Sequence, residues 1–192
     1  MEFSEQNFEM ALSYDAYSEY AESLLTNISS DNKNAMQQHA KVNLHIVQRL
    51  KKSVQLTNEL KHAIEKANPM IFLILTEGYC GDSAQTFPVF GRMQEMYPDI
   101  IEVKVVLRDE YLNIADTYFR TRAIPILICL DRQTFKEKFV WGNRPKPAQQ
   151  IMDNLKAVGA TQQEKSVALH RWYGKDKTLT LQQELTQLLT KK

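Results

Sequence analysis

The sequence has few cysteines, glycines and prolines. Among 192 residues there are two cysteines, Cys80 and Cys129, with six glycines and six prolines. The chain starts Met-Glu-Phe-Ser-Glu, which lacks the basic and apolar regions of a secretory signal. Two cysteines without an export signal argue against a structural disulfide, because disulfides belong to oxidising compartments. We therefore expect a cytoplasmic protein.

Long hydrophobic runs and a strong net charge are also missing. The longest apolar run, Met70 to Leu75, is far shorter than the roughly 20 residues that a helix needs to cross a bilayer. The formal net charge of +1 gives no general attraction to nucleic acid or to an anionic membrane. The four histidines are scattered away from cysteines and carboxylates, and the chain has no glycine-rich phosphate loop. We expect no metal, no cofactor, no nucleic acid and no membrane among its partners.

What the chain does have is the composition of a soluble globular protein, with 43% hydrophobic and 24% charged residues. Residues 1–68 contain no glycine or proline and no alternating strand pattern, which predicts helices throughout. A first helix should end near Asn27, and a long second helix should follow with Lys51 and Lys52 exposed. Apolar and small residues recur in that second helix at steps of four and three, which predicts a packing stripe of Met36, Ala40, Asn43, Val47, Leu50 and Val54.

The pattern changes at Pro69, after which strands and helices alternate. The sequence predicts strands at 70–76, 100–107, 124–130 and 135–141, the last two paired as a hairpin. It predicts helices at 82–96, kinked at Pro88, and at 110–119, 147–157, 161–172 and 178–190. This order indicates an α/β protein whose mixed sheet has parallel and antiparallel parts and helices on both faces.

Cys80 is the first candidate for chemistry because it lies where the buried strand at 70–76 should turn into a helix. The free amides at a helix start carry roughly half a positive charge, which favours a thiolate. A terminus worth about 1 kcal/mol would lower the thiol pKa by somewhat under one unit. The Ser83 hydroxyl could donate a hydrogen bond to the sulfur, whereas the Asp82 carboxylate would disfavour the thiolate. The sequence leaves the sign of the net pKa shift open.

Several motifs together resemble the thioredoxin family over residues 60–158. They are Tyr79-Cys80-Gly81-Asp82-Ser83, Pro88 eight residues after the cysteine, Arg122-Ala-Ile-Pro125 at the start of a later strand, and Trp141-Gly142 at the end of the hairpin. The segments Leu107-Arg-Asp-Glu110 and Trp141-Gly-Asn-Arg-Pro145 are similar to a group of bacterial thioredoxin-like proteins with a Cys-Gly-Asp motif. The resemblance implies a thioredoxin-like three-layer sandwich with helical N- and C-terminal extensions, residues 1–59 and 159–192, in one compact unit.

The resemblance also implies roles for individual residues. Cys80 and Ser83 would be the catalytic residues, and Tyr79, Gly81 and Asp82 would be supporting residues of the motif. Pro125 would be cis, so that the Ile124 backbone faces Cys80 and binds an extended peptide or glutathione. Arg122 and Arg144 could bind an anionic group near this site, or they could be solvated surface arginines.

Two positions depart from the family pattern. Ser83 replaces the resolving cysteine, and Ile74 stands where thioredoxins bury an aspartate that assists proton transfer. Without a second thiol, attack on a disulfide stops at a mixed disulfide that an external thiol must release. Cys129 cannot easily substitute for the resolving cysteine. Pro125 is expected beside Cys80, and four strand residues place Cys129 about 13 Å from Pro125. A disulfide needs Cα atoms within about 7 Å.

These features support three hypotheses. The first is a monothiol thiol-disulfide oxidoreductase with a low Cys80 pKa, whose partners are protein disulfides or low-molecular-weight thiols. The second is a non-catalytic thioredoxin-fold module that binds a protein, with Cys80 as an inert residue. The third is a thiol peroxidase, which is disfavoured because the sequence around Cys80 lacks a peroxide-binding arrangement of threonine and arginine. The helical extensions could cover a sheet edge, form a homodimer or shape the groove over Cys80.

Overall fold

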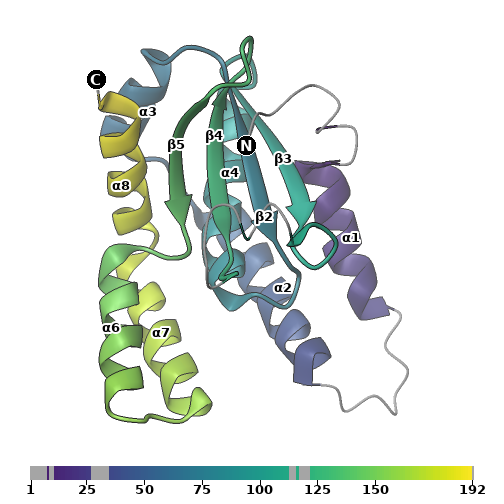
Figure 1. Cartoon of the computed structure of the whole chain (residues 1–192), viewed down its shortest axis with the longest axis vertical. Helices are drawn as coiled ribbons and strands as arrows, with labels where there is room; N and C mark the ends of the chain where they lie inside the picture. Colours follow the sequence, from purple (N-terminus) through teal and green to yellow (C-terminus); the bar gives the residue numbers. More distant parts are fainter. Residues whose placement is uncertain (1–7, 9–10, 27–34, 113–115, 117–121, 192) are drawn as a thin grey trace.

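The computed structural model describes residues 8, 11–26, 35–112, 116 and 122–191. Its centre is a five-stranded mixed sheet with the order β1-β3-β2-β4-β5 (Figure 1). The strands are β1 (Leu12–Ser13), β2 (Met70–Thr76), β3 (Ile101–Leu107), β4 (Ile126–Asp131) and β5 (Glu137–Gly142). β2 pairs in parallel with β3, and the other pairs are antiparallel. The predicted combination of parallel and antiparallel parts, with a β4–β5 hairpin, is confirmed.

The described helices pack on one face of this sheet or lie beyond its end (Figure 1). The described ones are α1 (Tyr14–Thr26), α2 (Ala35–Ser53), α3 (Asn58–Glu65), α4 (Gly81–Met96), α6 (Lys146–Ala157), α7 (Gln162–Asp176) and α8 (Leu179–Thr190). The bounds of α4, α6, α7 and α8 and the end of α1 agree with the predicted ones to within four residues, and Pro88 lies inside α4 as expected. The predicted helix from Glu110 to Phe119 lies largely outside the described residues.

Two local predictions for the first 68 residues are wrong. The expectation of helices throughout fails at β1, where Leu12 and Ser13 pair with Val105 and Lys104 of the edge strand β3. A strand of two residues is too short to show an alternating pattern, and its pairing partner lies far along the chain. Lys51, expected to be exposed, is partly buried: its Nζ donates to Ser18 Oγ at 3.2 Å and lies over the Tyr14 ring at 5.3 Å. Lysine stems pack on apolar surface in this way.

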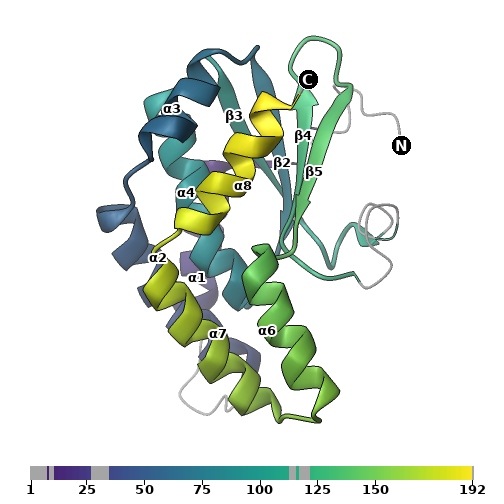
Figure 2. The same cartoon turned by 90° about the vertical axis from the view of Figure 1, so that its left-hand side faces the viewer.

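The sheet divides the core into two parts. One face, carrying Phe72 and Ile74, packs against α1, α2, α3, α4 and α8, and Figure 2 shows α2, α3, α4 and α8 together on that side. The other face, carrying Leu73 and Leu75, packs among the described residues against Phe8, Ala11, Tyr111, Phe135 and Val140. Covered on both faces, every residue of β2 is buried. Cys80 thus follows the most buried strand of the sheet.

The N-terminal helices cover α4. α2 packs along α4, and of the predicted stripe Ala40, Asn43, Leu50 and Val54 are buried. α1 approaches α4 closely, because the Tyr14 ring stacks on Phe87 with centroids 4.5 Å apart. Gly91 makes this approach possible, since a Cβ there would lie 2.2 Å from Tyr14 Cζ.

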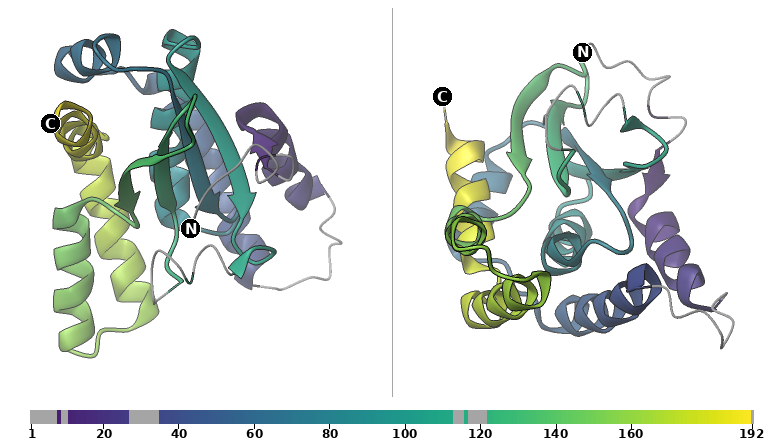
Figure 3. Two further views of the ribbon diagram at one scale, coloured as in Figure 1. Left: turned by 45° about the horizontal axis from the view of Figure 1, so that its top comes forward. Right: turned by 60° about the horizontal axis from the view of Figure 1, so that its bottom comes forward.

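The C-terminal helices pack on the core as well. α8 lies against α3, and Gln182 of α8 is fully buried, where its side chain accepts from the Thr57 N–H at 2.7 Å and donates to the Gln55 carbonyl at 3.1 Å. Glu184 accepts from Trp141 Nε1 at 2.7 Å. α6 and α7 form a hairpin that brings α7 beside α2 (Figure 3). Within the described part of the chain, no helix is long and apolar enough to cross a membrane.

Candidate active site

Cys80 lies between β2 and α4 as the N-cap residue of the helix, as the sequence predicts. Its N–H donates to the Glu77 carbonyl at 3.0 Å, and its carbonyl accepts from the Ala84 N–H at 3.1 Å. These bonds fix the turn and aim the first amides of α4 toward the sulfur. Gly81, the first residue of α4, packs loosely, because a Cβ there would meet only Asn43 Oδ1, at 3.8 Å. Cys80 is partly exposed and its thiol is free.

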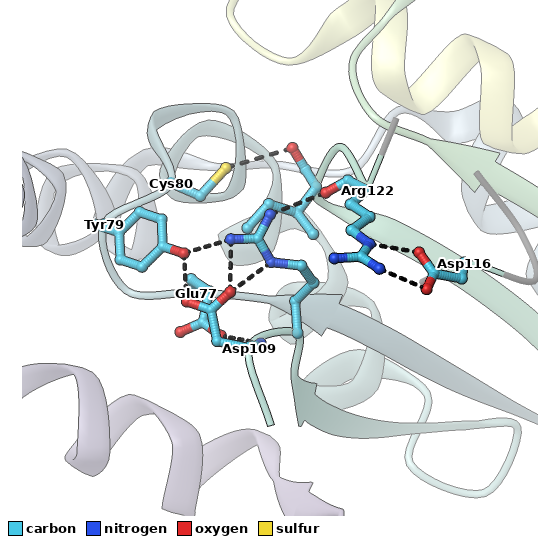
Figure 4. Close-up of polar contacts among 8 residues, drawn as sticks. Glu77, Tyr79, Cys80, Asp109, Asp116 and Arg122 are labelled. Carbon is cyan, nitrogen blue, oxygen red and sulfur yellow. Dashed lines mark hydrogen bonds and ion pairs between the residues drawn. The ribbon is translucent and has the colours of Figure 1, made fainter. Parts of the chain in front are cut away.

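The Cys80 thiol faces the loop before β4. Its Sγ donates to the Ile124 carbonyl, 3.4 Å away, and the Ile124–Pro125 peptide bond is cis (Figure 4). The expected juxtaposition of the Ile124 backbone and Cys80 is therefore present. Gly142 at the end of β5 lets this loop pack closely, since a Cβ there would lie 2.5 Å from the Pro125 carbonyl oxygen.

Ser83 lies in the first turn of α4 and is buried. Its Oγ accepts a hydrogen bond from Thr76 Oγ1 at 2.5 Å, and it hydrogen-bonds the Cys80 sulfur. The Tyr17 hydroxyl of α1 is buried nearby and interacts electrostatically with Cys80. The hydroxyl groups of Thr76 and Ser83 therefore form a buried polar pair beside the thiol.

The environment of Cys80 favours the neutral thiol. Burial raises the pKa of the Cys80 thiol, and the Asp82 carboxylate raises it further. Hydrogen bonds from the Ser83 hydroxyl and from the amides of Ser83 and Asp82 act in the opposite direction. The net direction is upward, opposite to the low pKa that the monothiol hypothesis expects, because the loss of water around the sulfur outweighs the amides at the helix start.

Asp82 belongs to a buried cluster of three side chains. Its Oδ2 accepts from Arg144 Nη2 at 2.6 Å and from Nε at 3.0 Å, while its Oδ1 accepts from the Tyr173 hydroxyl at 2.7 Å. The Asp82 and Arg144 side chains are only 10% and 11% exposed. Arg144 Nη1 also donates to Gln149 Oε1 at 3.0 Å. This cluster joins α4, the loop after β5 and α7 beside the thiol.

A second polar cluster fixes Tyr79, the residue before Cys80 (Figure 4). The Tyr79 hydroxyl donates to Asp109 Oδ2 at 2.6 Å and accepts from Arg108 Nη2 at 2.5 Å. Glu77 Oε1 accepts from the Asp109 N–H at 2.8 Å. Burial and the bond to Asp109 raise the pKa of Tyr79 to about 12, so this hydroxyl stays protonated at neutral pH.

Arg122 is engaged away from the thiol. Its guanidinium forms two bonds to the Asp116 carboxylate, at 2.5 and 2.8 Å, and both side chains are about half exposed. Its carbonyl accepts from Arg108 Nη1 at 2.9 Å, so Arg108 links the Tyr79 cluster to the loop before Pro125. Here Arg122 contributes its backbone to the shape of the site, and the proposed contact of its guanidinium with an anion remains a prediction.

Two cavities adjoin the motif. A small one of about 40 Å³ lies behind Cys80 between α1, α2 and α4, and Tyr17 and Ser83 line it. A larger one of about 240 Å³ lies between α2, α4 and α7 and is lined by Tyr79, Asp82 and Tyr173. The larger cavity offers space for part of a substrate next to the motif. Among the described residues, no group of three or more histidine, cysteine or carboxylate side chains could hold a metal.

Comparison with known families adds to this geometry. The family model described as Thioredoxin matches residues 30–156, about two thirds of the chain. The chain belongs to the thioredoxin family. Its fold, a mixed sheet flanked by helices with helical extensions, is the thioredoxin-like one predicted from the motifs. The family match includes α2, which precedes the 60–158 core expected from the sequence.

Solved structures support the thioredoxin-like fold. The chain is similar to an HIV epitope scaffold, with a TM-score of 0.59, 16% identity, and coverage of 97% of this chain and 98% of that chain. It is also similar to a protein of unknown function from Pseudomonas aeruginosa, with a TM-score of 0.58, 15% identity, and coverage of 95% and 93%. A comparison with curated proteins gives no match.

For a thioredoxin-family site, the sequence identified the centre but not all of its surroundings. Cys80, Ser83, Ile124 and Pro125 come together as expected. Arg108, Thr76 and Tyr173 were missed as parts of the site. Arg108 belongs to the Leu107–Glu110 segment of the resemblance, but that segment does not predict its hydrogen bond to Tyr79. No local pattern in the C-terminal extension indicates Tyr173.

Proposed function

We propose that the protein is a thiol-disulfide oxidoreductase that works through the single thiol of Cys80. The observation that carries this proposal is the position of that free thiol, on a partly exposed residue at the start of α4 and beside the Ile124 carbonyl. The carbonyl and N–H groups of the loop before β4 are suited to pair with an extended peptide or with glutathione. Ser83 supplies a hydroxyl where a second thiol would resolve the adduct.

The reaction requires two exchanges. In the first, the Cys80 thiolate attacks one sulfur of a substrate disulfide; a bond forms between Cys80 and that sulfur, and the other sulfur leaves as a thiolate that takes up a proton. In the second, an external thiolate attacks the mixed disulfide, and Cys80 leaves as a thiolate. For a glutathionylated protein whose glutathione sulfur is attacked, one external glutathione completes the cycle and the two glutathiones leave as glutathione disulfide; a protein disulfide ends as a protein–glutathione mixed disulfide, which a second glutathione must reduce.

The substrates are protein disulfides or mixed disulfides of proteins with low-molecular-weight thiols. We place the protein in the cytoplasm, where a pool of reduced thiols can serve as the second reactant. The two free cysteines of the chain fit a reducing compartment.

Trapping with glutathione tests this function. A Cys129→Ser variant incubated with oxidised glutathione should gain one glutathione at Cys80, seen by intact mass and peptide mapping. Excess reduced glutathione should then restore the free thiol. A Cys80→Ser variant should gain none, because Cys129 is fully buried. Failure to form the adduct between about pH 7 and pH 9.5, or an adduct that reduced glutathione does not release, contradicts the proposal.

The second candidate function is a non-catalytic protein-binding module. The observation in its favour is the raised pKa of Cys80, since burial and Asp82 leave little thiolate at neutral pH. For a module, Cys80→Ser should leave the affinity for a protein partner unchanged, and no partner should become disulfide-linked to the chain. Partner trapping that disappears in Cys80→Ser rejects the module.

A further inference from the structure

The C-terminal extension reaches the reactive centre through one side chain. Tyr173 of α7 is buried, and its hydroxyl donates to Asp82 Oδ1 at 2.7 Å. The other oxygen of the same carboxylate is held by Arg144 through two nitrogens, at 2.6 and 3.0 Å. Both oxygens of Asp82 therefore have fixed donors, and the carboxylate is held in one orientation.

This arrangement controls how much of the Asp82 charge acts on the thiol. Asp82 is the second residue after Cys80, and its negative charge disfavours the thiolate. A guanidinium and a hydroxyl that donate to the carboxylate offset that charge, because they place positive charge and positive hydrogen atoms against it. Arg144 also interacts electrostatically with Cys80 itself.

Other titratable groups face Cys80 from the remaining elements. Besides the Asp82 cluster, those that share its small cavity are Tyr17 and Glu22 of α1, Lys51 of α2, and Glu77 in the loop after β2. Lys51 is bound to Ser18, and Glu77 to the Asp109 amide. Among these described groups, the Asp82 carboxylate is linked to the C-terminal extension, because it accepts the hydrogen bond from the Tyr173 hydroxyl.

We propose that Tyr173 and Arg144 are positioning residues for the Cys80 centre: they hold the Asp82 carboxylate and offset its charge, which makes α7 part of the reactive site. The inference rests on the proposed role of Cys80 as the reacting group. α7 and its partner helix α6 would therefore do more than cover the core, since a change in how α7 packs would change the reactivity of Cys80.

The test measures the alkylation rate of Cys80 by iodoacetamide against pH, in a Cys129→Ser background. Tyr173→Phe removes one oxygen and should raise the pH midpoint of alkylation by about half a pH unit, because the carboxylate loses a donor. Arg144→Gln should raise it by about one pH unit, whereas Arg144→Lys should restore part of the shift. Asp82→Asn should lower the midpoint.

A double variant separates positioning from a general structural effect. If Tyr173 acts through Asp82, Tyr173→Phe should leave the midpoint unchanged when it is added to Asp82→Asn. The matched control is Tyr97→Phe, which removes a tyrosine–carboxylate bond to Glu65, 3.1 Å long, and should not shift the midpoint. Thermal unfolding of each variant shows which of them fold.

Two results overturn the proposal. One is a Tyr173→Phe variant whose midpoint equals that of the parent; the other is a shift of equal size with and without Asp82. If Tyr173→Phe does not fold, the cycle with Arg144→Gln and Asp82→Asn decides in its place: the Arg144→Gln shift should be smaller without Asp82, because only the direct interaction of Arg144 with Cys80 remains. Alkylation needs no disulfide exchange, so these shifts are expected even if the glutathione experiment fails and the proposed function is wrong.

Discussion

Ser83 occupies the position of a second thiol and is integrated into the core. Thr76 donates to its hydroxyl, and that hydroxyl in turn bonds the Cys80 sulfur. The serine therefore favours the thiolate form of Cys80, but it cannot complete a disulfide. At the scale of single residues, this replacement separates the chain from the dithiol pattern of the family it belongs to.

Restoring the second thiol should change the chemistry. Ser83→Cys should form an internal disulfide with Cys80, because residues three apart in a helix are neighbours on its surface. Intact mass under mild oxidation should show the loss of two hydrogens, and the glutathione adduct should no longer accumulate. Gln85→Cys, on the same helix but five residues from Cys80, should form no such bond. A Ser83→Cys protein that keeps its glutathione adduct contradicts this assignment.

The reactivity of Cys80 should rise with pH. Burial and Asp82 raise the pKa of its thiol above the ordinary value of about 8.5, so the protonated form prevails at neutral pH and the thiolate grows as pH increases. In the Cys129→Ser protein, the alkylation midpoint should lie above that of a free cysteine peptide measured alongside. A midpoint below that of the peptide would show that the helix start outweighs burial.

At the scale of elements, the contact between α1 and α4 depends on one missing side chain. Gly91→Ala would place a Cβ 2.2 Å from Tyr14 Cζ, in a ring that is itself stacked on Phe87. We expect a loss of about 1–2 kcal/mol in the free energy of unfolding, as overpacking exceeds the gain in helix propensity. Urea unfolding monitored by circular dichroism measures it.

Gly174 in α7 is the matched control for this change. A Cβ there meets nothing within 4 Å, so Gly174→Ala should be neutral or should stabilise the protein by up to about 1 kcal/mol. Equal effects of the two substitutions would show that the α1–α4 contact does not depend on Gly91.

The elements could be predicted to the extent that their signals are local. Pro69, the run from Met70 to Leu75, and Pro88 each mark a boundary or a kink within a few residues of itself. The two-residue strand β1 and the break between α2 and α3 were not predictable, because β1 depends on pairing with β3 and the break on bonds to Gln182. Periodicity carries no information about partners so far along the chain.

The candidate site could be predicted only in part. The sequence placed Cys80 and Ser83 at the strand-to-helix turn, and the family resemblance placed Ile124 opposite them. Tyr173 could not be found, because it is 91 residues from Asp82 and lies in an otherwise ordinary helix. The direction of the Cys80 pKa also needed the structure, since it depends on how much water the surrounding helices exclude.

At the scale of the whole molecule, buried tyrosines make stability sensitive to alkaline pH. Burial raises the pKa of Tyr14, Tyr17 and Tyr173 above the ordinary value of about 10. Above about pH 10 the unfolded chain loses these protons while the folded chain keeps them, so the free energy of unfolding falls as pH rises. Each tyrosine contributes up to about 1.4 kcal/mol per pH unit in that range.

Urea unfolding at about pH 8, 9.5 and 10.5 measures this dependence. The urea midpoint of unfolding should fall most between pH 9.5 and pH 10.5. When each protein is compared with its own midpoint at pH 8, the fall should be smaller for Tyr17→Phe than for the unchanged protein. A midpoint that stays constant to pH 10.5 would mean that these hydroxyls ionise in the folded protein as readily as in the unfolded chain.

We propose a thiol-disulfide exchange that Cys80 alone carries and that an external thiol completes. Its most direct test is the rate at which the protein reduces a glutathionylated peptide with reduced glutathione, measured at about pH 8. Cys129→Ser should keep the rate of the unchanged protein, and Cys80→Ser should fall to the uncatalysed rate. An unchanged protein no faster than the uncatalysed reaction, or a Cys80→Ser variant that keeps full activity, would contradict the claim.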